Sequence, residues 1–207
     1  MARFRLRLSG ALIVAAAAAI LVVPAANAGL ISGLIGSNCP SGGTQVFAPW
    51  GDSASYFLAP NGGLESGSTG WSLSGASVAS GNEPFLPTGS HSLSLPSGST
   101  ATSPVTCIGP KSVALRMFGT DLGGTDSGLR VRVIWYGLLN QVLGITDYNT
   151  FAPGRGWAPT SSVKSTGGFN LLLPLVGSTS ARVQLTPLGS GSAWRIDDLY
   201  IDPWLSA

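Results

Sequence analysis

Carboxylates stand at two points of this 207-residue chain where they could bind a cation. Glu65 follows a glycine-rich turn at residues 61–63, and Asp197 and Asp198 interrupt an apolar pattern near the C-terminus. Glycine turns expose main-chain carbonyl oxygens, and Ca²⁺ takes about six to eight oxygen ligands from carboxylates and carbonyls. We expect the two stretches to meet in space, to join the first strand of a sandwich to its last, and to hold a structural calcium ion.

The residues that could support catalysis are few. Two-carboxylate glycoside hydrolysis needs acids about 5 to 9 Å apart across a cleft, whereas Asp197 and Asp198 would point apart in a regular strand. His91 is the only histidine, and the serines beside it supply no acid to orient the imidazole. Glu83 is expected to be a turn residue rather than a ligand. We therefore expect no enzyme, and a hydrolase is the weaker alternative.

Arginine and aromatic side chains could recognise a sugar or a polyanion. Strand parity places three tryptophans in the core, namely Trp71, Trp135 and Trp194. Tyr136 and Trp157 are freer. If the strands that carry Arg116, Arg132 and Arg182 are neighbours in one sheet, these arginines would share a polar face with Tyr136. The alternative is a solvated sheet face that resists edge pairing.

Short strand patterns separated by Gly, Pro and Ser turns must position these side chains. Residues 113–118 and 129–136 alternate between apolar and polar positions, and residues 182–186 and 194–201 continue the pattern. About nine or ten such strands without helical periodicity indicate an antiparallel β-sandwich, with the jelly roll as first choice. We expect this domain at residues 55–203.

The two ends of the chain lie outside the expected sandwich. Residues 1–28 have a basic start, an apolar run and a small-residue cleavage site, which together predict a signal peptide for the general secretory route. Residues 29–54 would form an N-terminal arm with one short strand, and residues 204–207 a tail. We expect a secreted or cell-surface protein with no membrane span after cleavage.

Net charge argues against one class of partner. Three of the 11 basic residues belong to the predicted signal peptide, which leaves 8 basic against 9 acidic residues and a net charge of −1. The remaining chain has no Lys/Arg cluster, and we therefore do not expect it to bind nucleic acid.

Cys39 and Cys107 are the only cysteines. In an exported protein an even pair indicates a disulfide. Closing a loop of this length would stabilise the fold by about 4 kcal/mol in the chain-entropy description. A metal site or catalytic thiol is the alternative, but two cysteines and one distant histidine are too few for either. We predict a disulfide that ties the N-terminal segment to the body of the fold.

Two motifs resemble those of galactose-binding-like jelly rolls. The first is the glycine turn with Glu65 and Trp71, and the second is the terminal run with Trp194, Asp197 and Asp198. The resemblance is to carbohydrate-binding modules of families four, nine and twenty-two. The chain is also similar to small exported bacterial proteins that share the patterns at residues 81–85 and 92–96.

The resemblance implies a structural calcium and a glycan ligand. In those modules the corresponding Glu and first Asp bind calcium, which carries over to Glu65 and Asp197, with Asp198 as the other candidate. A β-bulge facing water, with Glu65 capping turn amides, is the alternative. The function expected from the resemblance is recognition of an extracellular glycan or cell-envelope polymer. A structural or adhesive surface protein with protein partners is the alternative.

Overall fold

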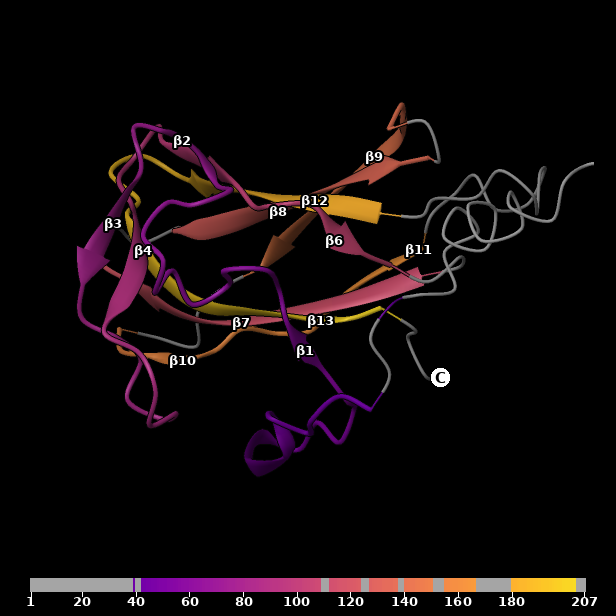
Figure 1. Ribbon diagram of the computed structural model, residues 1–207. Coiled ribbons are helices and arrows are strands. Elements are labelled where there is room, and N and C mark those ends of the chain that lie inside the picture. The colour runs from indigo at the N-terminus through magenta and orange to yellow at the C-terminus, as the bar shows by residue number, and fades with distance from the viewer. Residues whose placement is uncertain are drawn as a thin grey trace, which may run out of the picture.

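Two antiparallel β-sheets packed face to face make up the fold, which we describe from a computed structural model (Figure 1). The structure describes residues 39, 42–108, 112–123, 127–137, 140–150, 155–166 and 180–203. The predicted signal peptide, the strand pattern near residues 169–174 and the C-terminal tail lie outside these ranges. Among the described residues, no helix has the length and apolar character needed to cross a membrane. The all-β sandwich predicted from the alternating patterns is confirmed.

The lower layer of Figure 1, here the β7–β13 sheet, contains the last strand at its centre. Its main path runs through β10 (Ala158–Pro159), β7 (Ser112–Asp121), β13 (Trp194–Asp202), β4 (His91–Leu95) and β3 (Ser77–Ser80). The short strands β11 (Val163–Thr166) and β1 (Phe57–Leu58) also pair with β7 and β13, respectively. The first strand thus pairs with the last, as the sequence predicts.

The upper layer, here the β8–β12 sheet, is built around a long antiparallel pair. Its main path runs through β2 (Ser72–Ser74), β5 (Thr100–Thr102), β12 (Ser180–Leu188), β8 (Gly128–Tyr136) and β9 (Val142–Thr150), and β6 (Thr106–Cys107) pairs with β12. Nine residues of β12 pair with nine of β8 in unbroken register. This continuous register fixes which side chains stand together on the outer face of the sheet.

Alternation along the strands fills the space between the layers. On β8, Val131, Val133 and Trp135 are buried, while the residues between them stay partly exposed. Trp71 and Trp194 are buried in the same core, which confirms the core assignment of all three tryptophans. Burying a large apolar side chain contributes about 1.5–3 kcal/mol, so this pattern sets the orientation of each strand.

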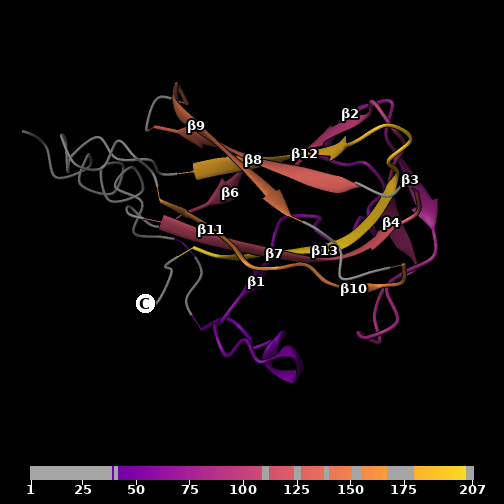
Figure 2. The ribbon, with the colours of Figure 1, turned by 180° about the vertical axis from the view of Figure 1, so that it is seen from behind.

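A second, smaller core lies on the outer face of the β7–β13 sheet. Phe47 and Tyr56 pack there against Phe118, with ring centroids of Phe47 5.2 Å from both partners. Figure 2 shows their indigo segment below the lower layer. The sequence predicts the end of an arm with a short strand at residues 44–54. The structure has instead a single bridge between Thr44 and Tyr56 and a 3₁₀ turn, η2 (Ala48–Trp50). Pro49 lies at the start of this turn and cannot donate a ladder hydrogen bond.

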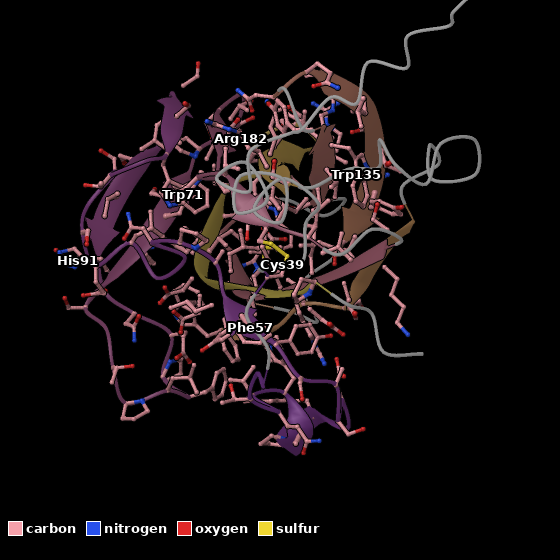
Figure 3. The ribbon with its side chains drawn as sticks, turned by 45° about the vertical axis from the view of Figure 1, so that its right-hand side comes forward. Cys39, Phe57, Trp71, His91, Trp135 and Arg182 are labelled. Atoms are coloured by element: carbon pink, nitrogen blue, oxygen red, sulfur yellow. A yellow bond between two sulfur atoms is a disulfide. The ribbon has the colours of Figure 1, made fainter. Side chains whose placement is uncertain are left out.

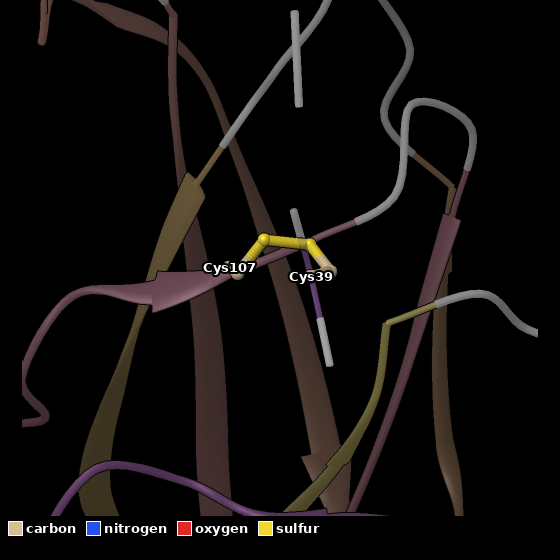
Figure 4. Close-up of a disulfide and its surroundings, with 2 residues drawn as sticks. All are labelled: Cys39 and Cys107. Carbon is tan, nitrogen blue, oxygen red and sulfur yellow. A yellow bond between two sulfur atoms is a disulfide. The ribbon is translucent and has the colours of Figure 1, made fainter. Parts of the chain in front are cut away.

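The predicted disulfide between Cys39 and Cys107 is present (Figure 4). The two Cα atoms are 5.3 Å apart and 68 positions separate them in sequence. Cys107 ends β6, which pairs with β12. The disulfide therefore joins the chain just before the outer core to the β8–β12 sheet.

Candidate functional site

The glycine turn lies against the aspartate doublet. Ala59 N donates to Leu199 O at 2.8 Å, and Leu199 N donates to Gly62 O at 3.2 Å, which extends the pairing of β1 with β13. A Cβ on Gly62 would lie 2.8 Å from Leu199 O, closer than real Cβ atoms come to other atoms. Glycine is thus required there for the turn to approach β13.

A β-bulge turns both aspartates toward this turn. The pairing of β13 with β7 shifts between Asp197 and Tyr200, and Asp198 has a left-handed φ of 49°. A Cβ on Gly63 would lie 2.6 Å from Asp198 Oδ1 and 4.0 Å from Asp197 Oδ1. The expectation that the two carboxylates point apart is therefore wrong, because it assumed a regular strand. The bulge does not face water either, since Asp197 is 0% and Asp198 7% exposed.

The buried doublet is short of compensating partners. Asp197 Oδ2 accepts a hydrogen bond from Glu83 N at 3.1 Å and Oδ1 one from Asp198 N at 2.9 Å. None of the hydrogen bonds or ion pairs within the described ranges uses the Asp198 carboxylate. Burial, with neighbouring acidic charges, raises the pKa of Asp197 to about 7 and the pKa of Asp198 to about 6. The pair needs a proton or a cation to be stable near neutral pH.

Glu65, the other expected ligand, is exposed and directed at β4. Its Oε1 accepts hydrogen bonds from Ser90 N and His91 N, both at 2.8 Å, and its Oε2 accepts one from Ser90 Oγ at 3.0 Å. The bond from Ser90 N is the main reason that the pKa of Glu65 falls to about 2. His91 Nδ1 lies 3.3 Å from Glu65 Oε2. Glu65 thus anchors the start of β4 to the glycine turn.

Glu83 is buried beside the doublet, a position that the sequence did not reveal. Its side-chain oxygens accept hydrogen bonds from Phe85 N and from Leu86 N, the latter at 2.8 Å. This is the expected turn role. Its charge also raises the pKa of Asp197 and of Asp198. The Glu-Pro sequence was a visible turn signal, but nothing local indicated that the turn folds onto β13.

The donor set has the chemistry of a calcium site but only two converging side chains. Asp197 and Asp198 offer carboxylate oxygens beside an exposed-carbonyl turn, without nitrogen or sulfur ligands, which suits a hard cation. In the part of the chain that the structure describes, no group of three or more His, Cys, Asp or Glu side chains is arranged to hold a metal. A calcium ion here would therefore depend on main-chain carbonyls and water for the rest of its shell.

Three of the predicted ligand-binding residues share the outer face of the β8–β12 sheet. Arg132 and Tyr136 are among the outward residues of β8, and Arg182 on β12 pairs with the outward residue Ile134 of β8. All three are partly exposed. Figure 3 shows Arg182 with the upper layer and His91 well away from it. The sequence indicated this grouping through strand alternation, and the pairing of β8 with β12 produces it.

Two residues that the sequence did not single out complete this face. Asp147 on β9 pairs with Arg132, accepting from Nε at 2.6 Å and from Nη2 at 2.8 Å, and these bonds lower the pKa of Asp147. Arg130 lies one outward position before Arg132 on β8. The alternation that placed Arg132 would also have found Arg130. Asp147 could not be found in this way, because a register shift between Trp135 and Tyr136 changes which residues of β8 and β9 are paired.

The other two predicted ligand residues belong to the opposite side of the molecule. Arg116 lies on β7 in the other sheet, donates to Asp52 Oδ2 at 2.8 Å and to Thr160 O at 2.8 Å, and stacks 4.6 Å above the Phe47 ring. Trp157 packs against the outer core. The expectation that Arg116 shares a face with Arg132 is wrong, because β7 is not in the β8–β12 sheet. Both residues have structural roles.

Further surface features lie on the outer face of the β7–β13 sheet, which carries the smaller core. Trp50 and Phe85 are 36% and 41% exposed, with ring centroids 5.1 Å apart. A cavity of about 630 Å³ lies between the N-terminal segment and the sheet, bordered by Asp52, Tyr56 and Lys164 among others. Tyr56 OH donates to Asp52 Oδ2, the same atom that accepts from Arg116, so these polar groups hold the segment in place.

Comparisons with known proteins find similarity in structure and not in sequence. No family model matches the chain, and no curated protein matches it either. The enzymatically active domain of tailspike protein 4 from bacteriophage CBA120 superposes with a TM-score of 0.50 at 12% identity, over 70% of this chain and 21% of the tailspike chain. The chain thus corresponds to about a fifth of that longer protein.

Carbohydrate-binding modules are among the other structural neighbours. A family 61 module in complex with β-1,4-galactotriose has a TM-score of 0.49 at 14% identity, over 70% of this chain and 97% of the module. A family 35 module from Clostridium thermocellum has a TM-score of 0.44 at 13% identity, over 74% of this chain and all of the module. At such low identity the likeness concerns the fold alone. The β-sandwich of this protein is established by its own two antiparallel sheets.

Proposed function

We propose that this protein is an exported, non-catalytic module that binds an extracellular glycan or cell-envelope polymer through the outer face of its β8–β12 sheet. One observation carries the proposal: polar side chains able to form several directed hydrogen bonds stand in register on that face. They are Thr102, Arg130, Arg132, Asp147, Arg182, Gln184 and Tyr136. The corresponding face of the other sheet is covered by residues 44–56.

The chemistry of this face suits a polyhydroxylated ligand. Guanidinium groups donate several hydrogen bonds in one plane, and carboxylate and carboxamide groups accept bonds from sugar hydroxyls. Ile145 on β9 is 55% exposed beside the arginines and gives an apolar contact for the C–H groups of a sugar ring. Polar groups in fixed register with a few apolar contacts are what specific ligand sites use.

A binding role is favoured over catalysis because no acid pair is available to a substrate on this face. Asp147 is held by Arg132 in a two-bond ion pair. Asp197 and Asp198 are adjacent, but they are buried and on the other sheet. Retaining or inverting hydrolysis requires two carboxyl groups on either side of an accessible bond. The described residues offer that arrangement neither on the open face nor at the doublet.

Export is supported by the predicted signal peptide and by the disulfide. Disulfides persist in oxidising compartments and are rare in the cytosol. The pair Cys39–Cys107 joins two segments that are 68 residues apart. We further propose that Asp197 and Asp198 hold a structural calcium ion, since a divalent cation would offset the repulsion of two buried carboxylates beside Glu83.

Affinity electrophoresis of the exported protein in gels containing soluble polysaccharides, together with a glycan array, tests the proposed function. We expect retardation by at least one glycan, and we expect Tyr136→Ala and Arg182→Ala to reduce it. Lys164→Ala is the matched control, because Lys164 is exposed on β11 of the other sheet. Specific self-association without retention by any glycan would overturn the proposal in favour of a structural or adhesive protein.

A further inference from the structure

Charge is unevenly distributed between the two sides of the sandwich. Arg130, Arg132 and Arg182 lie on the outer face of the β8–β12 sheet, where Asp147 is the one acidic residue among those described. The face therefore carries a net charge of +2, while residues 29–207 as a whole carry −1. All the other described acids belong to the β7–β13 sheet or its loops, namely Asp52, Glu65, Glu83, Asp121, Asp197, Asp198 and Asp202.

Two of the three arginines on this face lack the hydrogen-bond partners that Arg116 and Arg195 have. Arg116 binds Asp52 and a main-chain carbonyl, and Arg195 binds the Ser92 hydroxyl and the carbonyls of residues 80 and 81. Arg130 and Arg182 form no hydrogen bond or ion pair within the described ranges. Arg130 Nε is buried without a partner there. The guanidinium charge of Arg130 is therefore not neutralised by a directly bonded partner among the described residues.

The strand register separates the charges of Arg130 and Arg182 along the strand direction. Arg130 pairs with Thr186 and Arg182 pairs with Ile134, so the two unpaired arginines are four residues apart along the strands. At about 3.3 Å per residue this separation is roughly 13 Å, with the Arg132–Asp147 pair between them. One small anion does not span this distance, whereas a polymer with repeating charged groups does.

Resting on the function proposed above, we infer that the ligand is an anionic polysaccharide whose carboxylate or sulfate groups pair with Arg130 and Arg182. A guanidinium group binds a carboxylate or an oxyanion through two parallel hydrogen bonds, which a neutral hydroxyl cannot match. The Arg132–Asp147 pair would contact the uncharged hydroxyls between successive anionic groups. The net charge of the face would also steer a polyanion to it, and added salt would weaken the interaction.

Matched pairs of polysaccharides test the inference. Polygalacturonate is compared with its highly methyl-esterified form, and dextran sulfate with dextran, by isothermal titration calorimetry at low and high NaCl. We expect binding to the charged member of at least one pair and weaker binding at high salt. The pair that responds identifies carboxylate or sulfate as the recognised group.

Variants then assign the binding to the two arginines. We expect Arg130→Gln and Arg182→Gln each to weaken binding by about tenfold, because loss of one charge-assisted contact corresponds to about one decade in Kd. Lys164→Gln removes the same charge from the opposite side and should leave Kd unchanged. An unaltered melting temperature for all three variants shows that they are folded.

Three results would contradict the inference, and they are distinguishable. Equal affinity for the charged and neutral members of each pair would overturn the anionic ligand while leaving glycan binding intact. Binding to single-stranded DNA in place of polygalacturonate and dextran sulfate would replace the polysaccharide with a nucleic acid. Failure to bind any polysaccharide or array glycan would remove the proposed function itself.

Discussion

At the scale of single residues, the backbone of Asp198 decides where the aspartate doublet points. In a regular strand, adjacent side chains alternate between faces. The left-handed φ of Asp198 breaks this alternation and brings its carboxylate to Gly63, near that of Asp197. Aspartate tolerates this conformation better than most residues. Strained conformations of this kind persist where the surroundings determine them, often at sites that bind something.

Calcium should stabilise the protein through this doublet. We expect saturating Ca²⁺ to raise the melting temperature by about 5–10 °C over protein in chelator, since a ligand at 100 times its Kd contributes about 2.7 kcal/mol. Asp198→Asn should abolish the difference in differential scanning fluorimetry. Asp147→Asn, which alters an exposed carboxylate on the other sheet, should retain it. Equal melting temperatures of the parent protein with and without chelator would contradict the calcium proposal.

The doublet should also make stability depend on pH when calcium is absent. Burial raises the pKa of Asp197 to about 7 and of Asp198 to about 6, above the ordinary value of 3.8, so the folded state keeps protons that the unfolded state has released. In chelator, the free energy of unfolding should therefore fall as the pH rises from about 4 to 8. Urea denaturation at several pH values measures this slope.

Asp198→Asn provides the comparison for the pH experiment. It removes one of the two titrating groups and its repulsion of the other, so the decrease in stability between pH 4 and 8 should become smaller. A free energy of unfolding that rises across this range in the parent protein would mean that the doublet is not protonated in the folded state.

At the scale of elements, the glycine turn connects strands of the β7–β13 sheet. Residues 59–62 lengthen the β1–β13 pairing, and Glu65 fixes the start of β4 through Ser90 and His91. Asn61 supports the turn, since its side chain donates to Gly67 O and accepts from Ser66 N. The glycine turn is thus a structural junction of three strands, whether or not an ion is bound beside it.

Substitutions of the two glycines should separate folding from ion binding. A Cβ on Gly62 would meet the main-chain oxygen of Leu199 at 2.8 Å, so Gly62→Ala should destabilise the protein by about 1–3 kcal/mol in urea denaturation. A Cβ on Gly63 would mainly meet the side-chain atom Asp198 Oδ1. Gly63→Ala should therefore fold with nearly parental stability in chelator and lose the response to calcium. Parental calcium sensitivity in Gly63→Ala would contradict this placement of the site.

At the scale of the whole molecule, the two outer faces differ in what covers them. Residues 44–56 pack on the β7–β13 sheet through Phe47 and Tyr56, and the partly buried Arg116–Asp52 pair holds them. The outer face of the β8–β12 sheet keeps its arginines partly exposed. Seven of the eight described acids belong to the covered side, whereas the basic residues are divided between the two sides, so the open face has a net positive charge and the covered side a net negative one. This asymmetry is the physical basis for assigning ligand binding to one face and structural stabilisation to the other.

The disulfide constrains the whole chain, and its loss should lower global stability. Cys39 and Cys107 close a loop whose ends are 68 residues apart. Removing this constraint from the unfolded state costs about 4 kcal/mol in the chain-entropy description, so Cys39→Ser with Cys107→Ser should lower the free energy of unfolding by about that amount. Urea denaturation measures the change. Modification of two thiols by an alkylating agent without reductant, detected by mass, would show that the bond is absent in the exported protein.

Local rules were sufficient for some features of this protein. Alternation along residues 129–136 placed Val131, Val133 and Trp135 in the core and Arg132 outside it, because burial of apolar side chains sets the face of each strand. With only two cysteines, one disulfide pairing exists. Each of these conclusions depends on the alternation of residues within one strand or on the number of cysteines, and both can be read directly from the sequence.

Which side chains meet depended on contacts far apart in sequence, and only the tertiary structure decided them. Strand order placed Arg116 in the other sheet, and register brought Asp147 to Arg132. The bulge at Asp198 and the fold of the Glu83 turn onto β13 followed from packing around them. The sequence by itself determined the class of fold and the facing of its strands. Tertiary pairing determined the composition of the open face and of the buried carboxylate cluster, because register and strand order arise from the whole core rather than from any one strand.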